Sequence, residues 1–114
     1  MQKSPSPYIQ HIVDAVTKIG EYLEETDKVG FSIKSMTYDA VVRNLEIIGE
    51  ACSHLEEEFR GSHPHIPWTQ IIGMRNKLAH EYWDIDPDIV WQAATVEAPE
   101  LKKQLLELLS KIGQ

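Results

Sequence analysis

The sequence predicts an all-α fold, an up-down antiparallel bundle of four to five helices. Apolar residues recur at steps of three and four along most of the chain, which is the spacing of helices that bury one face. In one stretch these steps alternate regularly, as in a bundle seam: Val41, Leu45, Ile48, Cys52, Leu55 and Phe59. A chain of 114 residues without repeats or linkers suits one hydrophobic core, so we expect a single domain over residues 1–114.

The first two helices are delimited by their ends and their apolar faces. Ser6-Pro7 resembles an N-cap followed by proline, and the apolar stripe that follows predicts a helix ending near residues 28–30. The bundle seam predicts a second helix that runs to about Phe59. Gly49 lies in the middle of this helix, where glycine is unfavourable by about 1 kcal/mol relative to alanine, so we expect another helix to cross closely there.

The second half of the chain begins with a loop over residues 60–67, which contains Gly61 and two prolines. A helix then begins near Trp68. Asp86-Pro87 predicts the N-cap and first residue of a later helix, and we expect Pro99 to divide that helix. The last amphipathic segment carries the apolar residues Leu101, Leu105, Leu108, Leu109 and Ile112.

Charge and composition exclude several kinds of function. A net charge of −7 and the lack of a basic run argue against a protein that coats nucleic acid by charge alone. Cys52 falls on the apolar helical face, so we expect a packed side chain and not a catalytic thiol. No apolar run reaches the roughly 18 residues of a membrane span, and the start of the chain has no signal-peptide core, so we expect a cytoplasmic protein.

Two patterns suggest metal ligands, and neither fits well. His63 and His65 flank a proline near His54, but no cysteine pair completes a zinc site. The acidic run over residues 84–88 imitates the start of a calcium loop, but it lacks the later glycine and glutamate. We therefore expect no metal and no other cofactor.

The candidate site lies in residues 74–83, where polar side chains suited to phosphates and protons are concentrated. Arg75 falls within the apolar stripe of its helix, and a guanidinium there must be paired or face a cleft. His80, five residues later, lies about 140° away around a regular helix. We therefore expect the helix to end or bend near His80, or the two side chains to converge around the helix end.

These residues also carry a family resemblance. Arg75, four residues, His80, one residue and Tyr82 resemble the R-x4-H-x-Y motif of the HepT-like toxins, which belong to the HEPN superfamily of small helical ribonucleases. Asn76 fits the same pattern. The similarity extends to residues 39–51 and 66–68, and so covers most of the chain. Without the resemblance, a histidine at a helix end that bonds a carbonyl or pairs with a neighbouring carboxylate would be the slightly better interpretation of His80.

The resemblance implies a HEPN-like fold and a toxin that cleaves RNA, possible substrates being tRNA or mRNA. In such proteins a partner nucleotidyltransferase, the antitoxin, transfers AMP to the motif tyrosine, here Tyr82. The family also points to a homodimer. The motif helix and the segment after it also carry more large, mostly aromatic surface than a small core readily hides, which favours a dimer on independent grounds: Trp68, Tyr82, Trp83, Ile85 and Trp91.

Metal-independent RNA cleavage through the substrate's own 2′-hydroxyl fits the residues of the motif. His80 would transfer protons and Arg75 would neutralise charge on the phosphate, since imidazole and guanidinium groups suit those two tasks. Asn76 and Lys77 would orient the substrate. Arg43 and Glu46 share one stripe of the preceding helix with Glu50, either as a solvated ladder or with Glu46 orienting Arg75.

Two other classes of function remain open from the sequence. One is a non-catalytic helical subunit that binds a nucleotidyltransferase or a nucleotide ligand. The other is a dimeric helical adaptor without a ligand. The acidic balance slightly favours the binding subunit over the nuclease.

Overall fold

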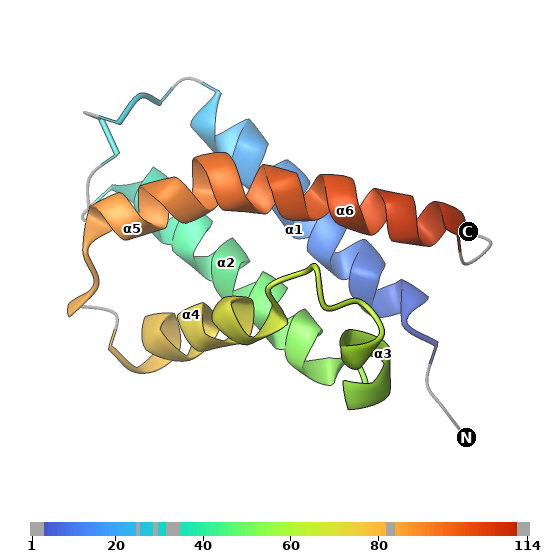
Figure 1. Cartoon of the computed structure of the whole chain (residues 1–114). Coiled ribbons are helices and arrows are strands. Elements are labelled where there is room, and N and C mark those ends of the chain that lie inside the picture. The colour runs from blue at the N-terminus through green and yellow to red at the C-terminus, as the bar shows by residue number, and fades with distance from the viewer. Residues whose placement is uncertain (1–3, 25, 29, 32–34, 82–83, 112–114) are drawn as a thin grey trace.

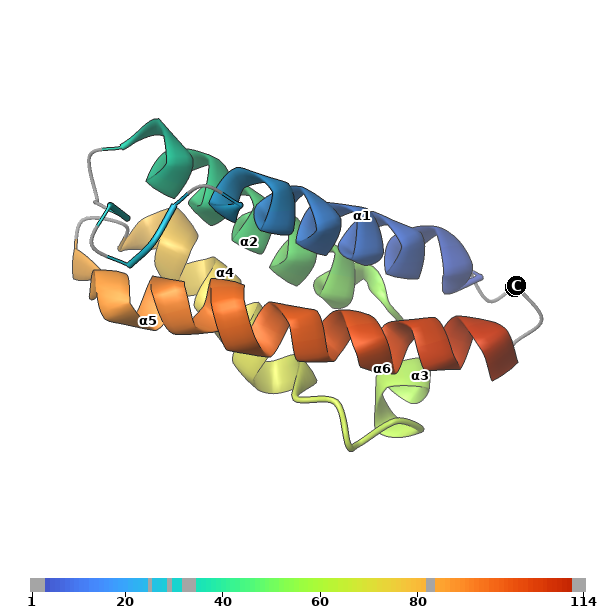
Figure 2. The same cartoon turned by 90° about the horizontal axis from the view of Figure 1, so that it is seen from above.

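A computed structural model describes residues 4–24, 26–28, 30–31, 35–81 and 84–111. Helices make up most of this part, and it contains no strand. The long helix α1 packs against both α2 and α6, and the shorter α4 packs across α2 (Figures 1 and 2). The prediction of an all-α bundle of antiparallel helices is confirmed.

Helices α1 (Ser6–Leu23) and α2 (Met36–His54) run antiparallel (Figure 2). The α1 helix begins at Ser6, and Pro7 lies in its first turn, where the missing N–H of proline is tolerated. The prediction that Ser6 is the N-cap was wrong, since Pro5 holds that position and no side chain caps the helix. It ends at Leu23, before the expected 28–30. Ser35 caps α2 by accepting a hydrogen bond from the Tyr38 N–H at 2.9 Å.

The second helix is shorter than the seam suggests. The α2 helix ends at His54, because Leu55 adopts an extended backbone, and a separate short helix α3 (Glu57–Gly61) follows. Leu55 is nevertheless buried, and Phe59 packs against the core. The apolar spacing therefore continues although the helix is interrupted between α2 and α3. Arg60 stabilises the break, since its Nε donates to the Leu55 carbonyl at 3.2 Å.

The C-terminal part is a continuous rod made of α5 (Pro87–Gln92), a π-helical turn η2 (Ala93–Glu97) and α6 (Ala98–Lys111), as Figure 1 shows. The prediction that Asp86 caps α5 is confirmed, since its carboxylate accepts from the Asp88 N–H at 2.9 Å.

Pro99 does not divide the helix, so that prediction was wrong. The Ala98 N–H reaches back to the Ala93 carbonyl, five residues earlier, and the turn widens directly before the proline. A wider turn gives the proline ring room against the carbonyl four residues back, which is where a regular helix would clash. The Thr95 hydroxyl also donates to the Trp91 carbonyl at 2.7 Å, a contact that often accompanies a bend.

One contiguous apolar cluster joins the helices. Its fully buried side chains include Ile9 and Ile12 from α1, Val41 and Cys52 from α2, and Leu105 from α6. Each large side chain of this kind contributes about 1.5–3 kcal/mol by leaving water. Within the described residues, no helix is both long enough and apolar enough to cross a membrane.

Candidate active site on the motif helix

The α4 helix (Trp68–His80) carries the R-x4-H segment and crosses α2 at Gly49. A methyl group placed on Gly49 would lie 2.1 Å from the Arg75 Cβ, 2.8 Å from its Cγ and 3.2 Å from the Ile71 carbonyl oxygen. Only glycine allows two helices to approach so closely, so the close crossing expected at Gly49 is confirmed. The crossing sets the Arg75 backbone directly against α2.

From this crossing the Arg75 side chain reaches along α2 to a carboxylate. Its Nη2 lies 3.1 Å from the Glu50 Oε2, and its Nη1 donates to the Asn76 Oδ1 at 3.0 Å. The Arg75 side chain is 32% exposed, so part of the guanidinium faces solvent. It has five N–H donors in total, and those beyond these two contacts can bind an anion.

Glu46 does not contact Arg75. It lies 3.9 Å from the Arg43 Nη1, one turn away on α2. The Arg43–Glu46 pair therefore corresponds to the solvated ladder, and the partner of Arg75 is the next acidic residue on that stripe. The sequence shows Glu50 on the stripe, directly after the glycine that marks the crossing, and that adjacency was the available signal for its role.

His80 is the last residue of α4, so the helix ends where the i+5 spacing requires an end or a bend. The Glu81 N–H closes the end by donating to the Lys77 carbonyl at 2.7 Å. Lys77 and His80 are both exposed in this last turn, where the helix dipole favours positive charge. Tyr82, the motif tyrosine, and Trp83 lie outside the described residues.

Arg75 and His80 do not contact each other. Within the described chain, the polar contacts of Arg75 go to Glu50 and Asn76, and those of α4's last turn go to its own backbone. A substrate phosphate, or a second copy of the helix, would have to bring the two groups to one reacting centre.

Glu50 also has a neighbour on its other side. Its Oε1 lies 4.0 Å from the His54 Nε2, and the His54 ring stacks on Tyr8 with centroids 5.7 Å apart. Glu50 therefore lies between Arg75 on α4 and His54 at the end of α2, and the shorter contact is the one with Arg75.

An apolar groove of about 470 Å³ adjoins the motif helix on another face of α4. Ile71 and Met74 of α4 form one wall, and the exposed Ile89 and Val96 belong to the opposite wall on the C-terminal rod. The 51% and 53% exposure of Ile89 and Val96 is high for such residues. Trp68 and Ile85, in contrast, are buried, and Trp91 packs against the core.

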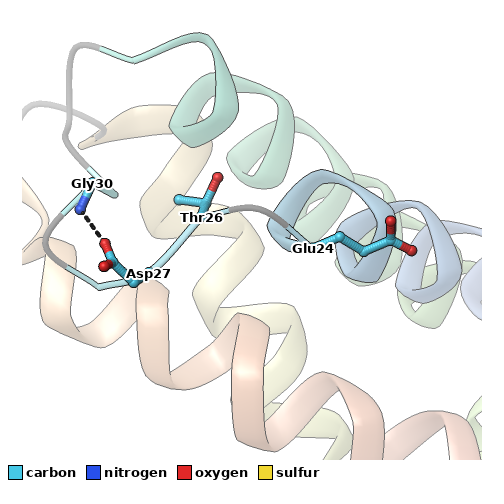
Figure 3. A pocket seen from close by; sticks show the side chains of 4 residues that line it. All are labelled: Glu24, Thr26, Asp27 and Gly30. Atoms are coloured by element: carbon cyan, nitrogen blue, oxygen red, sulfur yellow. Dashed lines mark hydrogen bonds between the residues drawn. The ribbon is translucent and has the colours of Figure 1, made fainter.

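A second pocket lies in the turn after α1, which is distant in sequence from the motif helix (Figure 3). Its lining includes Asp27, whose carboxylate accepts a hydrogen bond from the Gly30 N–H at 2.9 Å and so closes the turn. Asp27 is thereby engaged in holding the local backbone.

The other side chains with potentially reactive groups, Cys52 and His63, are engaged in packing. Burial raises the pKa of the Cys52 thiol to about 12, which keeps it protonated and unreactive at neutral pH. His63 packs on Phe59 with ring centroids 4.7 Å apart, and burial, with nearby positive groups, lowers its pKa. The His63 carbonyl accepts the Trp68 Nε1–H at 3.0 Å, which fixes the start of α4. In the described ranges, no three His, Cys, Asp or Glu side chains are grouped to hold a metal.

Comparison with known proteins places the motif in a family. The sequence profile described as ribonuclease HepT-like matches residues 12–108. A protein of Caldanaerobacter subterraneus subsp. tengcongensis, named "Putative RNase TTE0752", is 44% identical, over 96% of this chain and 97% of the relative. "Probable ribonuclease HepT" of Thermococcus cleftensis is 35% identical, over 95% of this chain and 98% of the relative.

A third relative is larger. "Gamma-glutamylcyclotransferase and putative RNase MJ0434" of Methanocaldococcus jannaschii is 33% identical over the whole of this chain, which spans 51% of that relative. No solved structure matches the chain.

Proposed function

The chain belongs to the ribonuclease HepT-like family of the HEPN superfamily, and on that premise we propose that it is the toxin of a toxin–antitoxin pair, an endoribonuclease that works without a metal ion. The observation that carries the proposal is the partly exposed Arg75 guanidinium on the helix that ends at an exposed His80. Both groups face solvent, where an RNA strand can reach them.

Arg75 supplies the charge that the reaction requires. The 2′-hydroxyl oxygen attacks the adjacent phosphorus, and negative charge grows on the phosphoryl oxygens in the transition state. A guanidinium can bind two such oxygens at once, and electrostatic stabilisation of this kind is often the largest single catalytic contribution. The Asn76 oxygen faces Arg75, which leaves its amide N–H groups free to donate to the same phosphate. Lys77 adds a second positive charge on the same turn.

His80 handles the protons. The 2′-hydroxyl loses a proton as its oxygen bonds to phosphorus, and the leaving 5′-oxygen gains one as its bond to phosphorus breaks. An imidazole side chain can perform either transfer near neutral pH. The products are a 2′,3′-cyclic phosphate and a 5′-hydroxyl end. DNA has no 2′-hydroxyl and cannot react in this way.

An assay with a labelled RNA tests the proposal. It compares cleavage by the wild type, by Arg75→Ala and by His80→Ala, each with and without a chelator. We expect both variants to lose activity and the chelator to have no effect. Persisting cleavage by His80→Ala, or complete loss with the chelator, would contradict it. Wild-type protein that binds RNA or a nucleotide without cleaving it would favour the non-catalytic binding subunit.

The proposed control of the toxin is covalent. A partner nucleotidyltransferase would transfer AMP to Tyr82, two residues beyond His80, and the added nucleotide would block RNA and bring like charge to the site. Intact-mass measurement after co-expression with the cognate partner tests this step. An unchanged mass, or neutralisation of Tyr82→Phe as efficient as that of the wild type, would refute it.

We further propose that the toxin acts as a homodimer whose cleft contains both copies of the motif helix. Support comes from the apolar groove beside α4, with its exposed Ile89 and Val96, since a second copy would cover them. The two Arg75 and two Lys77 side chains would then form a positive focus within an acidic particle.

Sedimentation tests the dimer with a matched pair of variants. Ile89→Glu, in the groove, should shift the protein to monomer, and Leu106→Glu, equally apolar and 46% exposed but outside the groove lining, should not. Activity restored by mixing Arg75→Ala with His80→Ala subunits would support a shared cleft. A fully active monomer would remove the dimer proposal.

A further inference from the structure

We propose that Glu50 is a positioning residue for Arg75, which holds the guanidinium in its phosphate-binding orientation before the substrate arrives. The inference rests on the proposed ribonuclease function, since it assigns a role within that site.

The contacts of Arg75 fix its guanidinium at two points. Nη2 is held by the Glu50 carboxylate at 3.1 Å and Nη1 by the Asn76 carbonyl oxygen at 3.0 Å. These partners come from two different helices, so the side chain is anchored both to its own helix and to α2. These two contacts do not use all five N–H donors of the guanidinium, and the remaining ones are available to phosphate oxygens.

The first part of the side chain is fixed as well. The Arg75 Cβ and Cγ lie where a Gly49 side chain would otherwise be, against the α2 backbone. Glu50 is the next residue along α2. The close crossing and the ion pair together therefore hold the whole Arg75 side chain, from its Cβ to its terminal nitrogens.

This arrangement affects catalysis through entropy. A free arginine side chain carries about 2 kcal/mol of rotamer entropy, which must be lost when it binds a phosphate in one orientation. A side chain that is already ordered loses less at that step, and misplacement by about 1 Å can lower a rate by about 100-fold. The His54 Nε2 lies 4.0 Å from the other Glu50 oxygen, which is beyond hydrogen-bonding distance, so Arg75 is the close partner of this carboxylate.

The same carboxylate has an opposing effect on binding. Glu50 is negatively charged and 49% exposed, so it repels an approaching phosphate and competes for the Arg75 donors. A positioning role therefore predicts a distinctive kinetic pattern: loss of Glu50 lowers kcat while KM for RNA stays equal or falls. Removal of an exposed ion pair that has no role in the site would change neither kcat nor KM by much.

The test compares Glu50→Ala, Glu50→Gln and Glu46→Gln on one RNA substrate. Glu50→Ala removes both the oxygen and the charge, and should lower kcat by about tenfold or more without raising KM. Glu50→Gln keeps an oxygen acceptor for Nη2 and should retain most of kcat with a lower KM. Glu46→Gln, one turn earlier on the same stripe, is the control and should match the wild type, since within the described residues Glu46 pairs with Arg43 and not with Arg75.

Two results would overturn the proposal. In one, Glu50→Ala keeps the wild-type kcat, as the Glu46 control does. In the other, Glu50→Ala raises KM and leaves kcat unchanged, which would make Glu50 a contributor to binding.

A measurement without RNA separates this inference from the proposed function. The Arg75 guanidinium nitrogens, observed by NMR, should rotate slowly about the Nε–Cζ bond in the wild type and freely in Glu50→Ala. Equal rotation in the two proteins would refute positioning whether or not the wild type cleaves RNA. Absent cleavage together with restricted rotation would refute only the nuclease.

Discussion

Replacing Gly49 with alanine probes the crossing of α2 and α4 directly. Nonbonded carbon atoms prefer separations of about 3.5–4.0 Å, and the new methyl group would start 2.1 Å from the Arg75 Cβ. The helices would have to separate by more than about 1 Å to restore an ordinary contact. Overpacking of this kind lowers stability by about 1–3 kcal/mol, and the better helix propensity of alanine recovers at most about 1 kcal/mol. We therefore expect a net loss of at most about 3 kcal/mol.

Urea unfolding of Gly49→Ala and Gly73→Ala measures this loss against a matched control. Gly73 lies within α4 with open space around its would-be Cβ, so Gly73→Ala should raise the free energy of unfolding by up to about 1 kcal/mol. The double variant Gly49→Ala/Arg75→Gly removes the closest clashing atoms. Its loss of unfolding free energy should therefore be smaller than the sum of the losses in the two single variants.

Activity should follow the same geometry. Because Gly49→Ala displaces the helix that carries Arg75, it should reduce RNA cleavage even at temperatures where the variant is fully folded. A Gly49→Ala protein as stable as the Gly73→Ala control, with wild-type activity, would refute the close crossing as the feature that places Arg75.

Three further predictions concern the scaffold. Asp86→Ala removes the cap of α5 and should lower the free energy of unfolding by about 1 kcal/mol in urea titrations. Pro99→Ala restores a backbone donor after the π turn and should raise that free energy, by less than about 3 kcal/mol; a loss would show that the π turn accommodates the proline at no cost. Burial raises the pKa of Cys52 in the folded chain to about 12, from an ordinary 9.0. The difference between the two pKa values leaves the stability of the fold unaffected below pH 9.0 and lowers it as the pH rises toward 12. Cys52→Ala should therefore lose less stability than the wild type as the pH rises from 9.0 toward 12, and an equal loss would argue against the raised pKa.

The sequence predicted the helical architecture well because that information is local. Apolar spacing, the Asp86 cap and the proline after Ser6 each depend on neighbours a few residues away. The position of the crossing was also readable, since a glycine in the middle of a helix is unfavourable unless another element packs closely against it.

The sequence did not predict the breaks in the helices. The seam through Leu55 and Phe59 keeps its spacing although the backbone leaves the helix between them, because both side chains still pack against the core. Pro99 looked like a helix terminator, but the π turn before it absorbs the missing hydrogen bond, and no local residue pattern announces such a turn.

The partner of Arg75 required three-dimensional information. Glu46 and Glu50 share one stripe of α2, and only the point at which α4 crosses decides which carboxylate the guanidinium reaches. Likewise, the sequence predicted more large aromatic surface along and after the motif helix than one core hides, whereas Trp68 is buried, and the exposed large apolar side chains of the C-terminal rod are Ile89, Val96 and Leu106.

The most direct measurement of the central claim is the mass of the RNA ends produced in the presence of a chelator. Attack by the 2′-hydroxyl predicts 2′,3′-cyclic phosphate and 5′-hydroxyl ends from the wild type, none from His80→Ala or Arg75→Ala, and no cleavage of a strand that carries a 2′-deoxy sugar at the cleavage position. Cleavage of that deoxy strand, or ends with a 5′-phosphate, would contradict it.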